Sequence, residues 1–85
     1  MKQLAKHVTM EDLKQFIQDE IMNLAFVKVG EDDSIVKSKL LDSITVVDLL
    51  VSIEEHIGKK IPQHLINEDN FDTINRICET VQQID

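Results

Sequence analysis

Apolar residues recur at intervals of three and four positions in three separate segments, and this periodicity constrains the fold more than any other feature of the sequence. Such intervals place apolar side chains along one face of a helix. The first segment contains Leu13, Phe16, Ile17, Ile21 and Leu24, and the last contains Ile74, Ile77, Cys78 and Val81. No segment alternates between apolar and polar residues as a half-buried strand does. The sequence therefore predicts an all-α fold.

The first helix has a well-marked start. Thr9 can cap it, Asp12 stands at the capping-box position, and Val8 can contact Leu13 as a hydrophobic staple. The apolar pattern then extends over about sixteen residues.

Residues 26–41 lack helical periodicity and contain Gly30 in front of an acidic cluster. We interpret them as a long connection anchored by Ile35, Val36 and Leu40. Connections of this length usually have a function.

A second helix is expected to begin at Asp42-Ser43, where both residues suit a helix N-terminus. It should run to His56 or Ile57, because Gly58 ends a helix well and Ile61-Pro62 confirms the break.

Two weaker signals follow. Residues 63–70 predict a short helical turn that contains Leu65 and Ile66 and is bounded by the polar residues 67–70. The last helix should start near Asp72 or Thr73, with Phe71 plugging the core in front of it.

The second helix has more apolar residues than one buried face needs. One stripe, expected to be buried, consists of Val46, Leu49, Leu50, Ile53 and Ile57. A second stripe of Ile44, Val47 and Val51 is rotated by roughly 100° and should be exposed, flanked by Asp48, Glu54 and Glu55. An apolar patch with a charged rim is typical of a docking site. The alternatives are a helix buried on all sides and charges that only aid solubility.

Chain length and net charge favour some classes of function over others. We expect residues 1–85 to form one domain, a small four-helix bundle of three longer helices and one short helix. Such a bundle leaves little room for a deep catalytic cavity, which favours a carrier or binding module over an enzyme. The net charge of −7 disfavours nucleic acid as a partner and suits basic patches on proteins.

The sequence predicts a cytoplasmic protein. Cys78 is the single cysteine, and the N-terminal residues lack the apolar run of a secretory signal. Charges interrupt every apolar run before the roughly twenty residues that a membrane span requires. We expect no insertion into a membrane, and we expect a monomer.

Other kinds of site have weak support. His7, His56, His64 and Cys78 lack metal-ligand spacing, so no metal is expected, and Cys78 at core spacing should be a small buried hydrophobe. The acidic cluster in the connection lacks the glycine and glutamate of a calcium loop at the required offsets.

The segment Leu40-Leu41-Asp42-Ser43-Ile44, followed by Val47-Asp48-Leu49, resembles the phosphopantetheine attachment motif of acyl carrier proteins. The resemblance continues through residues 53–62, which match the acidic end of the family's second helix, its glycine and its Ile-Pro step. The long first connection and the entry to the last helix at residues 71–74 also match, so the resemblance covers essentially the whole chain.

The resemblance implies a bundle of the acyl-carrier type whose Ser43 bears a phosphopantetheine arm. A phosphopantetheinyl transferase would add the arm from coenzyme A with the assistance of Asp42, and loading and transferring enzymes would exchange an acyl or aminoacyl group held on it as a thioester. No catalytic residue of its own is implied. By position, the recognition residues of the second helix would be Ile44, Val47, Asp48, Val51 and Glu54.

The sequence also departs from the family pattern. Thr45 stands where many fatty-acid carriers have an acid, Lys39 replaces a common glycine, and His56 breaks the acidic run. The resemblance implies a role in lipid metabolism and fatty acid biosynthesis. These changes leave attachment at Ser43 expected but weaken the expectation that the carrier serves ordinary fatty acid synthesis. The Leu-Leu-Asp-Ser-Ile form and Phe71 are similar to discrete carriers of aminoacyl or specialised acyl groups.

A serine at the start of a helix is well placed to carry a phosphodiester. The start of a helix offers free N–H groups and a positive dipole end, which favour a phosphodiester by about 0.3 to 1 kcal/mol. A plain helix cap is the alternative role for Ser43. Two other functions stay open, an unmodified helical adaptor that binds a partner through the second helix and, less favoured, a small enzyme, since no base lies at a readable spacing from Ser43.

Overall fold

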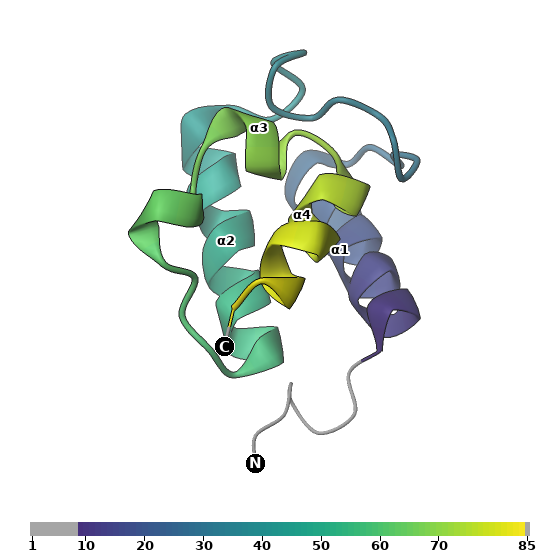
Figure 1. The fold of residues 1–85 in the computed structure, drawn as a ribbon. Coiled ribbons are helices and arrows are strands. Elements are labelled where there is room, and N and C mark those ends of the chain that lie inside the picture. The colour runs from purple at the N-terminus through teal and green to yellow at the C-terminus, as the bar shows by residue number, and fades with distance from the viewer. Residues whose placement is uncertain (1–8, 85) are drawn as a thin grey trace.

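The computed structural model describes residues 9–84, which form four α-helices and one 3₁₀ helix. In chain order these are α1 (Met10–Ala25), α2 (Ser43–Ile57), η1 (Gln63–Leu65), α3 (Glu68–Phe71) and α4 (Ile74–Gln82). In Figure 1, α1 and α2 run in opposite directions and α4 lies across them, while α3 and the connection from α1 cover the end where α2 begins. The predicted all-α bundle of three longer helices and one short helix is confirmed.

The start of α1 follows the sequence prediction. The side-chain oxygen of Thr9 accepts a hydrogen bond from the backbone N–H of Asp12, at 3.1 Å, and the Asp12 carboxylate accepts one from the N–H of Thr9. This reciprocal pair is the predicted capping box. Val8, the predicted staple residue, lies outside the described residues.

The core consists of the apolar faces that the periodicity predicted. The buried apolar residues of the helices are Leu13, Ile17, Ile21, Leu49, Ile53, Ile57, Phe71, Ile74, Ile77, Cys78 and Val81. Phe16, Leu24, Val46 and Leu50 flank this core and are partly buried. The predicted burial of Phe71 and Cys78 is confirmed.

The prediction that Leu40 anchors the connection is wrong. Ile35 is fully buried and Val36 packs against the core, but Leu40 is 38% exposed and Leu41 is buried in its place. The backbone N–H of Lys39 donates to the carbonyl of Val36, and that of Leu41 donates to the carbonyl of Ile35. This turn directs Leu41 inward and leaves Leu40 outside.

The region after α2 also differs from its prediction. The polar residues 67–70 were expected to bound one turn, but the structure has two turns, η1 and α3. The side chain of Asn67 accepts a hydrogen bond of 2.8 Å from the N–H of Asn70 and so caps α3. Polar residues at this place start a helix because they can satisfy its free N–H groups.

Asp72 holds the long connection against the end of α3. Its carboxylate accepts hydrogen bonds from the Ser34 hydroxyl at 2.7 Å and from the N–H of Lys37 at 2.8 Å, and its carbonyl accepts one from the N–H of Ile35 at 2.7 Å. The donors to the carboxylate, above all the N–H of Lys37, lower the pKa of the Asp72 carboxyl. The side chain and the carbonyl of Asp72 therefore hold residues 34–37 of the connection that leads to Ser43.

Candidate functional site

Ser43 is the first residue of α2 and its side chain is exposed. The cap of α2 is Asp42, whose carboxylate accepts a hydrogen bond of 2.8 Å from the N–H of Thr45. This contact with Thr45 is the main cause that lowers the pKa of the Asp42 carboxyl. Within residues 9–84 the Ser43 hydroxyl has no hydrogen bond, so the alternative that Ser43 is the helix cap is wrong.

A hollow of about 500 Å³ lies beside Ser43, between the start of α2, the end of the connection and α3. Its apolar wall is formed by Val36, Leu41, Val46, Val47, Ile66 and Phe71. Its polar residues are Lys39, Asp42, Ser43, Asn67 and Glu68. A group attached to Ser43 therefore starts at the edge of a hollow with an apolar wall and a charged rim.

The second apolar stripe of α2 is exposed, as predicted. The exposed fractions are 73% for Ile44, 54% for Val47 and 45% for Val51, whereas Leu49, Ile53 and Ile57 are buried. The alternative of a helix buried on all sides is therefore wrong. The stripe starts at the residue after Ser43 and follows the helix for two turns.

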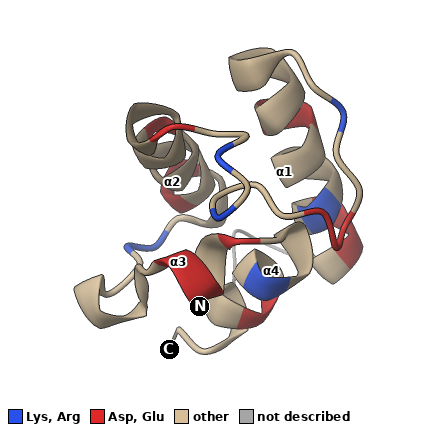
Figure 2. Ribbon diagram, turned by 90° about the horizontal axis from the view of Figure 1, so that it is seen from above, with Lys and Arg blue, Asp and Glu red and all other residues tan. Residues whose placement is uncertain are grey.

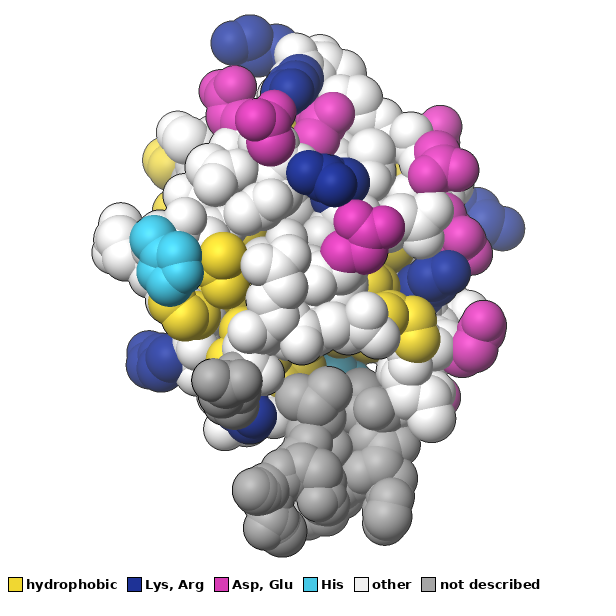
Figure 3. Space-filling model, in the orientation of Figure 1, with side chains coloured by type: hydrophobic (Ala, Val, Ile, Leu, Met, Phe, Trp, Pro, Cys, Tyr) yellow, Lys and Arg dark blue, Asp and Glu magenta, His cyan; other side chains and the backbone are white. Residues whose placement is uncertain are grey.

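The charges along α2 are all acidic. Asp48 and Glu55 are exposed beside the stripe, and α2 contains neither Lys nor Arg (Figure 2). On the face that has α4 in front, by contrast, acidic and basic side chains are interspersed (Figure 3). An exposed apolar stripe with carboxylates beside it is complementary to a basic protein surface with apolar contacts.

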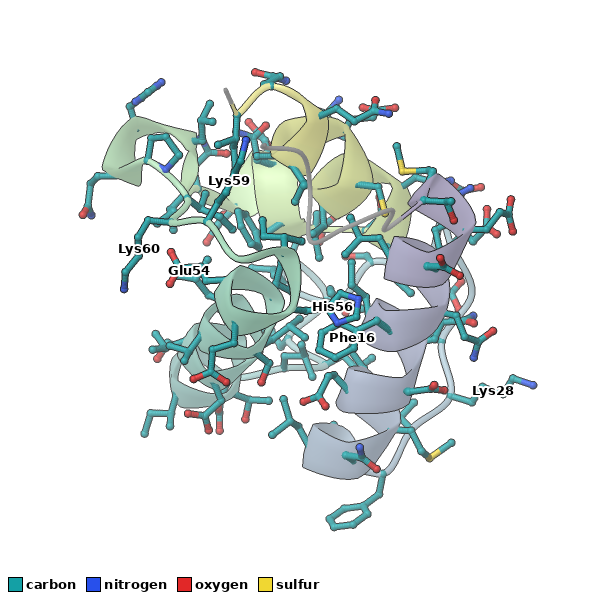
Figure 4. The ribbon with its side chains drawn as sticks, turned by 90° about the horizontal axis from the view of Figure 1, so that it is seen from below. Phe16, Lys28, Glu54, His56, Lys59 and Lys60 are labelled. Atoms are coloured by element: carbon teal, nitrogen blue, oxygen red, sulfur yellow. The ribbon has the colours of Figure 1, made fainter. Side chains whose placement is uncertain are left out.

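Glu54 differs from the other predicted recognition residues. Its side chain is only 14% exposed, and its carboxylate accepts a hydrogen bond of 2.8 Å from the backbone N–H of Ile61. The Lys60 ammonium lies 3.7 Å from its second oxygen, and both side chains are labelled in Figure 4. Glu54 thus supports the chain that leaves α2, a contact that spacing along the helix could not reveal.

His56 faces α1. Its ring stacks on that of Phe16 with the centroids 3.9 Å apart and an angle of 9° between the planes (Figure 4). Its Nε2 atom is buried without a hydrogen-bond partner within the described residues. His56 therefore belongs to the contact between α1 and α2. This contact explains why a histidine interrupts the acidic run in the sequence.

Within residues 9–84, the remaining candidates form no second site. No group of three His, Cys, Asp or Glu side chains within residues 9–84 is arranged to hold a metal ion, and His7 lies outside that range. Burial raises the pKa of the Cys78 thiol to about 11, which keeps the thiol protonated and unreactive at neutral pH. None of the helices in residues 9–84 has the length and apolar character to cross a membrane.

Lys39 is a feature of the site whose role the sequence did not predict. Its φ is 69°, in the left-handed region where a residue with a Cβ costs roughly 1 to 2 kcal/mol and glycine costs little. This conformation explains why a glycine is common at the position. It also places a lysine among the residues that line the hollow.

Comparisons with known proteins agree with this geometry. A family model described as the phosphopantetheine attachment site matches residues 20–81. The D-alanyl carrier protein of Lactobacillus delbrueckii subsp. bulgaricus is 28% identical over 74 residues, which cover 80% of this chain and 92% of that protein. The D-alanyl carrier protein of Leuconostoc citreum is 27% identical over 80% of this chain and 95% of that protein. That of Lactobacillus acidophilus is 28% identical over 87% of this chain and 96% of that protein.

Proposed function

Because the chain belongs to the phosphopantetheine-attachment family and is a carrier protein, we propose that Ser43 is the residue that bears its arm. The observation that supports this assignment most directly is the exposed Ser43 hydroxyl at the start of α2, which Asp42 leaves free by capping the helix in its place. A phosphodiester there faces the free N–H groups and the positive end of the helix.

The other serines are less suited to attachment. Ser34 donates its hydroxyl to Asp72, and Ser38 donates its hydroxyl to the carbonyl of Ser34 at 2.6 Å. Ser52 lies inside α2, where the backbone N–H groups are already paired within the helix. Modification at Ser34 or Ser38 would break the contacts that hold the connection, which also favours Ser43.

The residues around Ser43 fit the covalent group. The arm is flexible and combines methyl and methylene groups with a phosphate, a hydroxyl and amides, and the neighbouring hollow offers an apolar wall with polar residues at its edge. When bound, the arm supplies the thiol that holds the cargo as a thioester. Asp42, whose lowered pKa keeps it ionised, would assist attachment by facing the metal and pyrophosphate at the transferase.

We propose that the enzymes which modify, load and unload the carrier recognise the exposed stripe of α2. Its apolar members are Ile44, Val47 and Val51, and Asp48 supplies a charge beside them. Glu54 would contribute by fixing the end of the helix, through its bond to Ile61. The chemistry belongs to these partner enzymes, and the carrier acts by keeping the cargo at a high local concentration.

For the cargo we propose an aminoacyl group of the D-alanyl type. This proposal rests on the relatives, which are D-alanyl carrier proteins. The core is consistent with it, because Ile17, Ile53 and Ile77 are fully buried and a long acyl chain that entered between the helices would have to displace such side chains. We further propose that the carrier acts as a monomer in the cytoplasm, where coenzyme A and reducing conditions are available.

Mass spectrometry tests the attachment site. The purified chain is incubated with coenzyme A, magnesium and a broad-specificity phosphopantetheinyl transferase, and one arm is expected on the peptide that contains Ser43. Ser43→Ala keeps the Asp42 cap and should stay folded by circular dichroism but gain no mass. An adduct on another serine, or no adduct on the folded wild type with several transferases, would contradict the assignment and favour an unmodified adaptor.

A separate measurement tests the cargo. The protein is purified from its own cells at mildly acidic pH, which preserves thioesters, and its intact mass is compared with that of the hydroxylamine-treated sample. A labile increment equal to one alanyl group supports the proposal, and chiral analysis of the released amino acid identifies the enantiomer. A labile fatty acyl increment would contradict it.

A further inference from the structure

We propose that Lys39 binds the phosphodiester at the root of the arm and thereby orients the arm toward the hollow beside α2. The inference rests on the proposed attachment to Ser43. It assigns a positioning role to a residue that the sequence marked only as a replacement for glycine.

The backbone at Lys39 gives no reason for a lysine. Its φ of 69° favours glycine, and the turn is already fixed by the bonds from Lys39 N–H to Val36 and from Leu41 N–H to Ile35. A strained residue that lines the hollow at the proposed attachment site is a reason to look for a function of its side chain. Lys39 is one of the residues that line the same hollow as Ser43.

The charges around the hollow favour this role. Asp42 and Glu68 are the acidic residues that line it, and Lys39 is the single basic one. A phosphodiester on Ser43 adds another negative charge at neutral pH, so a cation at the rim would offset repulsion between the phosphate and these carboxylates. An ammonium on a flexible stem is a common partner for phosphate.

Two other lysines that lie in or against the long connection are already paired. Lys37 forms an ion pair with Asp69, and Lys14 lies 3.2 Å from Glu31. Lys39 has no ion pair within the described residues, and its side chain is exposed. It is therefore available to an anion that arrives with the arm.

The arm's own phosphorus provides the readout. ³¹P relaxation of the modified protein reports the mobility of the phosphodiester, and carbon–proton spectra report the side-chain methylene groups of Lys39. Converting the unmodified to the modified wild type should shift the Cε resonance of Lys39, and the phosphodiester should be less mobile at low than at high ionic strength.

Three variants separate charge from structure. Lys39→Gln should make the phosphodiester more mobile, and Lys39→Arg should retain the wild-type mobility; both keep a Cβ and so keep the backbone strain unchanged. Lys28→Gln is the matched control, since it removes the same charge from a lysine that extends away from the bundle (Figure 4). Lys28→Gln should leave the mobility of the phosphodiester unchanged.

Each outcome decides the proposal. Equal ³¹P relaxation in the Lys39→Gln, Lys28→Gln and wild-type proteins would overturn the role of Lys39 while leaving attachment intact. Slower modification of Lys39→Gln with unchanged ³¹P relaxation would place Lys39 in the transferase contact and also overturn it. Failure of Ser43 to gain the arm, seen beforehand in the intact mass, would overturn both proposals.

Discussion

The backbone N–H of Ile61 donates a hydrogen bond of 2.8 Å to the carboxylate of Glu54, which joins the last turn of α2 to the chain that leaves it. Gly58, in the left-handed conformation with φ 73°, turns the chain back so that this bond can form. Glu54 is therefore part of the framework that positions α2, whereas Asp48 and Glu55 project from its exposed side.

Replacing Glu54 with Ala should lower the free energy of unfolding by about 1 to 3 kcal/mol, because the N–H of the buried Ile61 loses its acceptor. Glu55→Ala, at the neighbouring exposed position, should change it by less than about 0.5 kcal/mol. Urea denaturation of both variants measures the difference. Equal small changes would show that the bond to Ile61 contributes little.

The Asp72 tether should weaken in acid. The pKa of Asp72 is lowered in the folded protein, so the carboxylate stabilises the fold above its ordinary pKa and this stabilisation is lost as the pH falls through the lowered value. Asp72→Asn should lose less stability at acidic pH than the wild type. Asp48→Asn, on the exposed face of α2, should lose as much stability as the wild type. Thermal unfolding as a function of pH measures the slopes, and identical slopes for wild type and Asp72→Asn would contradict the prediction.

The two stripes of α2 should respond differently to truncation. Ile53 is fully buried, so Ile53→Ala should cost about 2 to 5 kcal/mol, while Val51, which is 45% exposed, should cost less than about 1 kcal/mol when replaced by Ala. Chemical denaturation compares the two. Large losses for both would mean that the Val51 stripe is covered in solution.

Charge reversal at Asp48 should slow modification by the transferase, because exposed charges at an interface mainly govern the rate of encounter. Asp48→Lys should lower the apparent second-order rate constant without changing the circular dichroism spectrum, and added salt should slow the wild type as well. Glu11→Lys makes the same charge change on α1. If this control slows modification as much as Asp48→Lys, net charge and not the α2 face sets the rate.

Cys78 should resist alkylation in the folded protein. Its thiol is buried and has a pKa of about 11, whereas an arm attached to the exposed Ser43 would carry its thiol outside the helical core. Iodoacetamide at neutral pH should therefore label the modified protein once, on the arm, and the unmodified protein only after unfolding in urea. Rapid labelling of Cys78 in the folded unmodified protein, mapped by peptide mass, would show that the core opens readily.

The positions of the helices could be predicted from the sequence because they depend on local chemistry. The apolar spacing of residues such as Ile17 and Ile53, the capping box of Thr9 and Asp12, and the break at Gly58 act over a few neighbouring residues. The same local reasoning located Ser43 at the start of a helix and predicted that Val47 and Val51 would be exposed. Short segments such as α3 were harder to predict, since a few polar residues can either end one helical turn or cap the start of another.

Tertiary structure decided the direction of side chains whose partners lie far along the chain or beyond a turn. Glu54 faces inward because Ile61 offers a free N–H, His56 faces inward because Phe16 provides a stacking surface, and Leu41 replaces Leu40 in the core because the turn at Lys39 is left-handed. The sequence by itself determined the helices, their buried faces and the exposed serine at the start of α2. Which charged side chains support the fold and which remain available to a ligand depended on contacts that form only when separate segments meet.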